Sequence, residues 1–308
     1  PWLSVGAIWS AVRKADLLIS GGGSLLQNVT SGRSLYYYLS VILLARMAGT
    51  PVMLYAQGIG PVCGGFARWL MTAISRRVAR ITVRDYGSLE ELRSLNITQP
   101  PSEVTADPVL AIHPVDRGIG RAILTKYKAA GAKPVVGISV REWRGWSGYK
   151  KAIAAAADEI AREFEARVIF LPMQYPEDVE IARKIAAQAE ETMIVLDEEY
   201  TTSELLSIVG NLDLLISIRL HGLIFAGVMG VPMVGISYDP KIDRFLDSID
   251  EKPAADLKTA TVKNIMAAVR EKWANRKNEA EQREGRLAEL RRLAARNAEL
   301  ALELIEKM

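Results

Sequence analysis

Four cationic side chains stand at the ends of short apolar segments or just beyond them. Arg84, Arg141 and Arg219 close ITVR, GISVR and ISIR, and Lys241 follows VPMVGIS within YDPK. A guanidinium group offers two parallel N–H donors that match the oxygens of a carboxylate or a phosphate, and an ammonium group adds a compact positive charge. The four side chains therefore predict a binding site for a small ligand with several negative charges.

His221 lies two residues after Arg219, and the chain has one other histidine, His113. An imidazole transfers protons near neutral pH, so His221 and the adjacent Arg219 are the candidate catalytic residues, with His221 as general acid or base. A structural alternative is a histidine that caps the following helix. Two distant histidines and a single cysteine, Cys63, do not make a metal site, and no D-x-D motif suggests Mg²⁺. We therefore expect neither a metal nor a cofactor.

Three consecutive glycines, Gly21–Gly23, follow the apolar segment ADLLIS. Glycines at the end of a strand let backbone N–H groups approach an anion or a sugar closely. The pattern is neither G-x-G-x-x-G nor the Walker motif, and a plain tight turn is the alternative. Ser24, Gln27 and Asn28 follow, and their neutral hydrogen-bonding groups suit the hydroxyl groups of a sugar better than a phosphate.

The elements that must position these residues alternate between aliphatic segments and amphipathic segments. This alternation predicts βαβ units, with parallel sheets covered by helices on both faces. It restarts at KPVVGISVRE, after a segment at 113–134 that we interpret as a linker and a first helix. The predicted fold class is α/β, with one Rossmann-like domain at 1–115 and a second at 116–308. In such folds ligands bind at the carboxyl ends of strands, which is where the arginines stand.

Residues 262–308 are predicted to be helical, with an apolar side that includes Leu287, Leu293 and Leu300. We interpret this segment as a long helix that packs across the domains. A helix that lies on a membrane surface and a coiled-coil partner are the alternatives.

The composition is that of a soluble globular protein, with 49% apolar and 24% charged residues. The 39 basic and 36 acidic residues nearly balance, so the charge gives little reason to expect a nucleic-acid partner. No apolar run reaches the roughly 20 residues that span a bilayer. A single cysteine excludes a disulfide framework, so we expect a cytoplasmic protein.

From about residue 15 to residue 250 the chain resembles the polysaccharide pyruvyl transferases, and especially their bacterial cell-wall members. The resemblance is carried, in this order, by ADLLISGGGSLLQNVTSGRSLYYY, PVMLYAQGIGPV, RITVRD, TADPVL and ISIRLHGLIFAGVMGVPMVGISYDPK. It implies a fold like that of the two-domain GT-B glycosyltransferases. It also implies transfer of the enolpyruvyl unit of phosphoenolpyruvate onto a sugar as a pyruvate ketal, with release of phosphate.

In the cell-wall branch the implied acceptor is a β-linked N-acetylmannosamine of a lipid-linked precursor of a secondary cell-wall polymer, which anchors S-layer proteins once it is modified. We then expect phosphoenolpyruvate, this saccharide and a peripheral contact with the inner membrane face as partners. On this interpretation Arg84, Arg141, Arg219 and Lys241 hold phosphoenolpyruvate, and His221 handles the proton. The predicted acceptor contacts are Gly22, Gly23, Ser24, Gln27 and Asn28.

Two departures from the family pattern matter. The family usually opens with a strand and a glycine-rich loop, G-x-x-N-x-G-D-E-A, and this segment is absent from the sequence, so we expect a truncated first domain. Asn28 also stands where we expect an aspartate. A GT-B glycosyltransferase with a nucleotide-sugar donor and a non-catalytic sugar-binding protein remain as alternatives. No acidic residue that could hold a donor ribose lies between His221 and Tyr238, which argues against the first of these.

Overall fold

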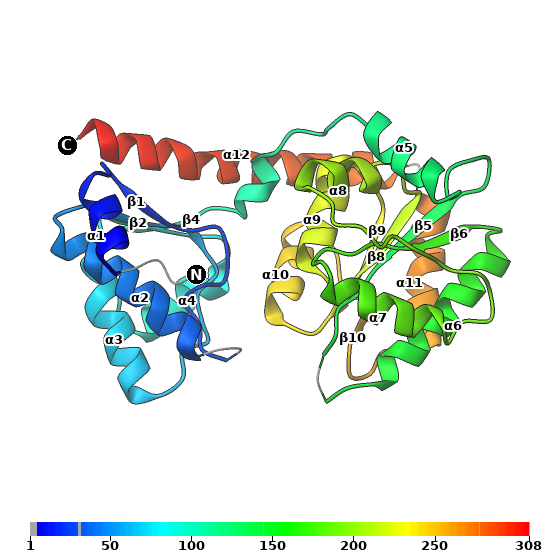
Figure 1. The fold of residues 1–308 in the computed structure, drawn as a ribbon, viewed down its shortest axis with the longest axis horizontal. Helices are drawn as coiled ribbons and strands as arrows, with labels where there is room; N and C mark the ends of the chain where they lie inside the picture. The colour runs from blue at the N-terminus through cyan, green and yellow to red at the C-terminus, as the bar shows by residue number, and fades with distance from the viewer. Residues whose placement is uncertain (1–4, 30–31, 144, 277, 308) are drawn as a thin grey trace. The chain divides into compact units, whose positions relative to one another are not determined.

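The computed structural model describes residues 5–29, 32–143, 145–276 and 278–307 (Figure 1). The chain divides into two compact units: unit 1 comprises Pro1–Ala111 with Glu289–Met308, and unit 2 comprises Ile112–Ala288. Each unit is an α/β structure built on one parallel sheet. The expected α/β fold with a long C-terminal helix is therefore confirmed.

Unit 1 contains a four-stranded sheet in the order β1-β2-β3-β4, with all three strand pairs parallel (Figure 1). Its elements are α1 (Val5–Arg13), β1 (Leu18–Gly21), α2 (Gly32–Met47), β2 (Val52–Gln57), α3 (Gly65–Ser75), β3 (Arg80–Val83), α4 (Tyr86–Ser94), β4 (Ser102–Val104) and the short 3₁₀ helix η1 (Pro108–Ala111).

The strands of unit 1 are covered on both faces. Because side chains alternate along a strand, Val52 and Leu54 of β2 pack with the helices α1 to α4, whereas Met53 between them packs against Leu300 and Ala301 of the last helix, α12 (Glu279–Glu306). The carboxyl ends of β1, β2 and β3 then meet at one edge, where the glycine turn and Arg84 follow the strands.

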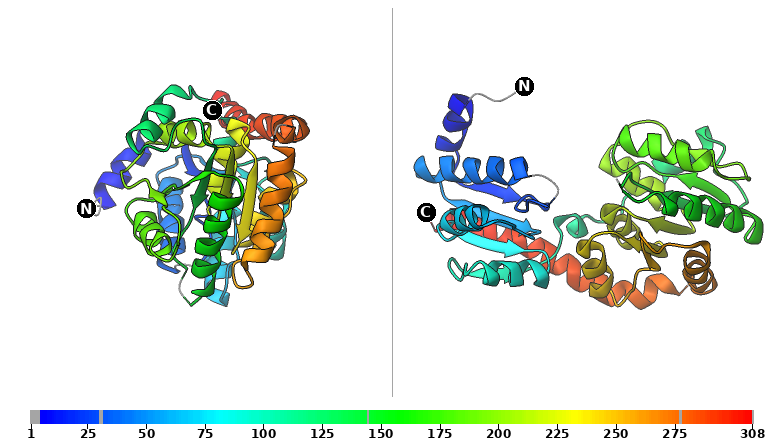
Figure 2. Two further views of the ribbon diagram at one scale, coloured as in Figure 1. Left: turned by 90° about the vertical axis from the view of Figure 1, so that its right-hand side faces the viewer. Right: turned by 90° about the horizontal axis from the view of Figure 1, so that it is seen from below.

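Unit 2 contains a six-stranded parallel sheet in the order β10-β9-β8-β5-β6-β7. Its elements are α5 (Gly118–Lys126), β5 (Val135–Ser139), α6 (Gly148–Glu163), β6 (Arg167–Phe170), α7 (Glu177–Ala186), β7 (Ile194–Val195), α8 (Thr202–Val209), β8 (Leu214–Ser217), α9 (Leu220–Met229), β9 (Met233–Ser237), α10 (Pro240–Ser248), β10 (Ala255–Asp256) and α11 (Val262–Asn275), followed by the start of α12. Figure 2 shows both sheets from two further directions.

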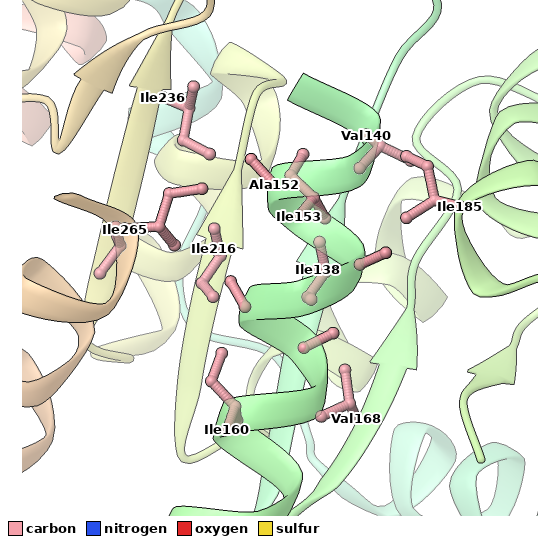
Figure 3. Close-up of a cluster of buried hydrophobic side chains, with 14 of the residues drawn as sticks. Ile138, Val140, Ala152, Ile153, Ile160, Val168, Ile185, Ile216, Ile236 and Ile265 are labelled. Atoms are coloured by element: carbon pink, nitrogen blue, oxygen red, sulfur yellow. The ribbon is translucent and has the colours of Figure 1, made fainter. Parts of the chain in front are cut away.

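The strand order of unit 2 reverses between β5 and β8. From β5 the chain adds β6 and β7 on one side, returns to place β8 against the other side of β5, and then adds β9 and β10. The core beside this reversal is aliphatic: Ile138 of β5 and Ile216 of β8 pack against Ile153 of α6 (Figure 3). A point of reversal leaves a crevice at the carboxyl ends of the two strands, and open α/β sheets bind their ligands there.

The end of α12 is anchored in unit 1 by a buried asparagine. The Asn297 side chain accepts hydrogen bonds from the hydroxyl groups of Thr82 (2.6 Å) and Thr105 (2.9 Å), and its amide donates to the carbonyl of Ala106 (3.3 Å). Asn297 is fully buried, so these bonds satisfy groups that would be costly to bury alone.

The sequence-based division placed all of residues 116–308 in the second domain. In the structure the boundary between the units falls between residues 111 and 112, and residues 289–308 pack with unit 1. The physical reason is that Leu300 and Ala301 cover the face of β2 that α1 to α4 leave open.

Candidate functional site

The candidate site of unit 2 lies at the carboxyl ends of β5 and β8, where the strand order reverses. Ser139 and Ser217 end these strands and lie opposite each other in the sheet. Arg141 follows Ser139, and Arg219 and His221 follow Ser217, so the fold brings the two predicted cationic segments to neighbouring strand ends. The next strand beyond β8 is β9, which is followed by Tyr238 and Lys241.

Tyr238 connects two of the predicted cations. The guanidinium of Arg141 donates a hydrogen bond from Nη1 to the Tyr238 hydroxyl, and its Cζ lies 4.9 Å from the centroid of the Tyr238 ring. The Lys241 ammonium lies 5.4 Å from the same centroid. Two cations within about 6 Å of one aromatic ring are attracted by its electron-rich face and are held near each other. The structure thus brings Arg141 and Lys241 together in one cluster around Tyr238.

Trp143 and Tyr149 also contact residues of this cluster. The Trp143 ring lies 4.6 Å from the Tyr238 ring and 5.3 Å from the guanidinium carbon of Arg141. The hydroxyl of the buried Tyr149, in α6, donates to the backbone carbonyl of Arg141 (2.8 Å), so the backbone after β5 is fixed as well. Lys241 also lies 3.4 Å from the carboxylate of Asp239, which offsets part of its charge.

Two polar atoms in this region are buried without a hydrogen-bond partner among the described residues: Ser139 Oγ and Arg141 Nε. Ser139 is fully buried. A buried donor without a partner is unfavourable by roughly 1–3 kcal/mol, and such groups in a folded protein call for a physical explanation. Here both groups stand at the carboxyl edge of the sheet, which is where open α/β sheets bind their ligands.

Arg219 is engaged by a buried carboxylate. Its Nε donates to Asp178 Oδ2 (3.0 Å), its Nη2 donates to Asp178 Oδ1, and Nη2 also contacts Gln174 Oε1 (3.2 Å). The side chain of Asp178 is 1% exposed and that of Arg219 is 15% exposed. The ion pair fixes the arginine at the end of β8, and Nη1 is the guanidinium nitrogen that these bonds do not use.

His221 lies in the first turn of α9, and its side chain is exposed. Arg219 occupies the N-cap position of this helix, and His221 is the second residue of its first turn. Gly222 follows in the same turn, and a Cβ there would lie 2.5 Å from Ser217 Oγ. Glycine therefore lets α9 begin directly against the end of β8, with backbone N–H groups that favour an anion at this edge.

Arg84 occupies the corresponding edge of unit 1, and its side chain is 7% exposed. Its guanidinium donates to Asp107 Oδ2 (3.0 Å) and to Ser24 Oγ (2.8 Å). Gly58 makes room for it, because a Cβ at that position would lie 2.8 Å from both Arg84 Nη2 and Ser24 Oγ. Arg84, in unit 1, thus ties the glycine turn to the segment after β4, whereas Arg141 and Lys241 belong to unit 2.

The glycine turn is held by backbone bonds from Gly22 N to the Tyr55 carbonyl (2.9 Å) and from Gly58 N to the Gly23 carbonyl (3.0 Å). Asn28 uses both ends of its amide on Cys63: Nδ2 donates to the carbonyl (2.7 Å) and Oδ1 accepts from the N–H (2.8 Å). An aspartate could accept the second bond but could not donate the first.

Gln27, by contrast, folds back locally, since its Oε1 accepts from the N–H of Val29 (2.9 Å). The buried Gln57 at the end of β2 has an Oε1 atom without a partner among the described residues. Like Ser139 Oγ in unit 2, Gln57 Oε1 is a buried polar atom without a hydrogen-bond partner in the described part of the chain, and it lies at the carboxyl edge of the unit 1 sheet.

Sequence reasoning missed Tyr238, Trp143 and Asp178. The first two carry a sequence signal, since each stands within three residues of a predicted cation: Trp143 two after Arg141, and Tyr238 three before Lys241. Asp178 carries none, because it lies 41 residues from Arg219. Within the described ranges no cluster of three His, Cys, Asp or Glu side chains could hold a metal ion.

Comparison with solved structures shows the fold. A UDP-GlcNAc 2-epimerase from Neisseria meningitidis bound to UDP-GlcNAc matches with a TM-score of 0.66 at 12% identity, over 97% of this chain and 81% of that one. Anabaena Alr3699/HepE in complex with UDP-glucose gives 0.63 at 10% identity, over 97% and 82%. A glycosyltransferase from Rickettsia africae ESF-5 gives 0.61 at 10% identity, over 100% and 84%. The predicted GT-B-like class of two Rossmann-like domains is confirmed.

Among curated proteins, no sequence matches this chain. A family model does: the model for polysaccharide pyruvyl transferase matches residues 2–240, which include the glycine turn, the R-L-H triplet after β8 and Tyr238. This span takes in both sheet edges at which the candidate residues lie. The chain is therefore a member of the polysaccharide pyruvyl transferase family and, by that membership, a transferase.

Proposed function

We propose that this chain transfers the enolpyruvyl unit of phosphoenolpyruvate to a saccharide, forms a pyruvate ketal and releases phosphate. The observation that carries the proposal is the cluster of Arg141 and Lys241 on Tyr238, at a sheet edge with buried, unpartnered donors. Phosphoenolpyruvate joins a carboxylate and a phosphate on a three-carbon frame. A ligand with this charge suits two adjacent cations of different geometry.

The donor site is assigned to unit 2. Arg141 and Lys241 hold the anionic groups of phosphoenolpyruvate, and the N-terminal turn of α9 adds backbone N–H groups. Arg219 contributes through Nη1 while Asp178 fixes its position. Arg84 has a different part in this proposal, because its charge is matched by Asp107 and its contact with Ser24 shapes the glycine turn.

The chemistry requires one proton to be delivered and others to be removed. A proton adds to the methylene carbon of phosphoenolpyruvate and leaves positive charge at C2, to which a sugar hydroxyl adds as it loses its proton. The C2–phosphate bond then breaks, and a second hydroxyl of the same sugar closes the ketal and releases its proton. His221 is the assigned proton-transfer group, because it is exposed in the first turn of α9 beside Arg219.

The acceptor side is assigned to the glycine turn of unit 1, with Gly22, Gly23, Ser24, Gln27 and Asn28 as its residues. The proposed acceptor is a β-linked N-acetylmannosamine of a lipid-linked cell-wall precursor, which would bring the protein to the cytoplasmic face of the membrane. The support is the neutral character of these side chains and the unpartnered Gln57 Oε1 at the same edge. Asn28 bonds to Cys63, so its role is to hold the turn rather than to act as a base.

The test is release of phosphate from phosphoenolpyruvate with a β-linked N-acetylmannosamine saccharide present. We expect His221→Gln to lower kcat by about 10²–10⁴ while phosphoenolpyruvate still raises the melting temperature. Arg141→Ala should instead abolish most of that rise. His113→Gln and Arg162→Ala are the matched controls, since both lie outside the site. Wild-type turnover in His221→Gln would refute the proton-transfer role.

The same assay separates the proposed function from transfer of a sugar. Two of the three structural neighbours named above were solved with UDP-GlcNAc or UDP-glucose, and they share only the fold with this chain. Stabilisation of the protein by UDP but not by phosphoenolpyruvate would overturn the donor assignment in favour of a nucleotide-sugar enzyme.

A further inference from the structure

The segment at 17–84 of unit 1 has an unusual charge. It contains seven arginines and neither an aspartate nor a glutamate, whereas the whole chain has a net charge of only +3. Three of the arginines pair with carboxylates that lie later in the chain: Arg68 with Glu91, Arg80 with Glu103 and Arg84 with Asp107. The other four, for which the described residues provide no carboxylate within 4.0 Å, are Arg33, Arg46, Arg76 and Arg77.

Two of these unpaired cations are held close together. Arg46 lies in the last turn of α2, and Arg77 follows α3. Burial lowers the pKa of Arg46, and the nearby positive charge of Arg77 lowers it further. Like charges that are placed side by side on a surface repel each other unless an anion lies between them or over them. This end of the two helices is therefore arranged for an external negative charge.

The same two helices expose large apolar side chains next to the arginines. On α2, Tyr36, Leu43 and Met47 are 41%, 39% and 67% exposed, and their spacing of 7 and 11 residues places them on one stripe. On α3, Phe66 and Trp69 are 65% and 61% exposed.

The two stripes join into one surface. The Tyr36 ring lies 6.2 Å from the Phe66 ring, which stacks on Trp69 at 5.8 Å. Helices α2 and α3 lie side by side on the face of the unit 1 sheet opposite α12 (Figures 1 and 2). We call Tyr36, Leu43, Met47, Phe66 and Trp69 the aromatic patch. It is an apolar surface bordered by arginines that have no carboxylate partner among the described residues, although Arg76 donates to the backbone carbonyl of Asn96.

We propose that the aromatic patch and its bordering arginines dock unit 1 onto the surface of an anionic phospholipid bilayer. Tryptophan and tyrosine favour the level of the lipid headgroups, and arginines beside them match the charge of anionic lipids. None of the described helices is long and apolar enough to cross a membrane, so the contact is peripheral. A nucleic acid would use the arginines but leave Leu43 and Met47 without an apolar partner, and the charge border distinguishes the patch from a purely apolar protein interface.

This docking surface deepens the membrane contact that the proposed function includes, yet none of its residues is assigned to the donor or to the acceptor. The purified chain is sedimented with phosphatidylcholine vesicles that contain or lack phosphatidylglycerol. We expect binding to the anionic vesicles that weakens with salt, and little binding to the neutral ones. Phe66→Ser with Trp69→Ser should weaken binding at least about tenfold, and Arg76→Gln with Arg77→Gln should weaken it by a similar factor and flatten its salt dependence.

Tyr175→Ser is the matched control, because Tyr175 is 47% exposed in unit 2, and it should bind vesicles like the unmodified chain. Equal binding to neutral vesicles, or unchanged binding by both double variants, would overturn the proposal. Sedimentation equilibrium could also overturn the proposal: if the chain is a dimer and the Phe66/Trp69 double variant is a monomer, a second copy of the chain occupies the patch. Tighter binding to RNA than to vesicles would overturn it as well. Phosphate release with a water-soluble saccharide, measured on the same variants, distinguishes the two proposals. Vesicle binding without phosphate release would refute the proposed function alone. Phosphate release without vesicle binding would refute the docking surface alone.

Discussion

Removal of either partner of the Arg219–Asp178 pair should destabilise unit 2 strongly, and removal of both should cost less than the sum. The carboxylate of Asp178 accepts from the N–H groups of Met173 (3.0 Å) and Gln174 (2.9 Å) and from two nitrogens of Arg219. With 1% of its side chain exposed, it cannot recover these interactions from water. The pair is thus both an ion pair and the anchor of the turn before α7.

Breaking a buried pair by removing one partner costs about 3–5 kcal/mol, because it leaves a charge without compensation. We expect a value near the lower limit for Arg219→Ala, since two backbone donors still serve Asp178. Asp178→Ala should cost more, because it strands Arg219 and both N–H groups. In a unit of fewer than 200 residues, 3 kcal/mol corresponds to a fall in Tm of about 6–12 °C. The double variant should fall short of additivity by about 1.5–3 kcal/mol.

The measurement is urea unfolding of the four proteins, followed by circular dichroism. Arg162→Ala is the control, since Arg162 pairs with Glu190 and Glu191 on the surface and should cost less than about 1 kcal/mol. Strict additivity, or single variants that unfold like Arg162→Ala, would show that Arg219 is not fixed by Asp178. The assignment of Nη1 as its free nitrogen for a ligand would then lose its basis.

Two further outcomes follow from residues near the two sheet edges. Burial raises the pKa of Tyr149 to about 12, so the neutral phenol is favoured in the folded state: its contribution to stability is complete below pH 10 and declines as the pH rises towards 12. At pH 8, Tyr149→Phe should be less stable than the unmodified chain by about 1 kcal/mol, because it lacks the hydrogen bond to the Arg141 carbonyl. Between pH 10 and 11 the variant should lose less stability than the unmodified chain. Urea unfolding that shows the same loss for both proteins over this pH range would contradict the prediction. Asn28→Asp should reduce the free energy of unfolding by about 1 kcal/mol and lower Tm, as Asn28→Ala should, because an aspartate cannot donate to the Cys63 carbonyl. An Asn28→Asp variant that is at least as stable as the original chain in thermal unfolding would contradict this pairing.

The fold followed from the sequence because its cause is local and repetitive. Aliphatic segments such as VVGIS and MVGIS are strands that are buried on both faces, and each is followed by an amphipathic helix, so parallel sheets were predictable from period and order alone. The placement of residues 289–308 was not, since the apolar side of a helix does not state which of two sheets it covers. That choice depended on Met53 and on the two threonines that Asn297 satisfies.

The candidate site was predictable in part for a similar reason. Residues that follow a predicted strand, such as Arg141 and Lys241, can be placed at the ligand-binding edge from the sequence, because the carboxyl ends of parallel strands lie at one edge of the sheet. The partners of Arg219 and Arg84 were not predictable. Asp178 contacts Arg219 from the first turn of α7, Asp107 contacts Arg84 from the loop after β4, and no local sequence pattern encodes either contact. Three of the four predicted anion-binding cations therefore contact carboxylates of the protein itself: Arg84, Arg219 and, at 3.4 Å, Lys241.

The anchoring of α12 has a consequence for the order in which the protein becomes stable. Thr82 and Thr105 are bonded by Asn297, which lies 215 and 192 residues further along the chain, and the segment at 112–288 forms a separate unit in between. A ribosome therefore completes all of unit 2 before unit 1 receives the helix that covers one face of its sheet. Contacts of such long sequence separation form slowly. Unit 1 thus begins the chain but is finished last, with Met53 and its neighbours uncovered during synthesis, when a chaperone or a membrane has the greatest opportunity to bind them.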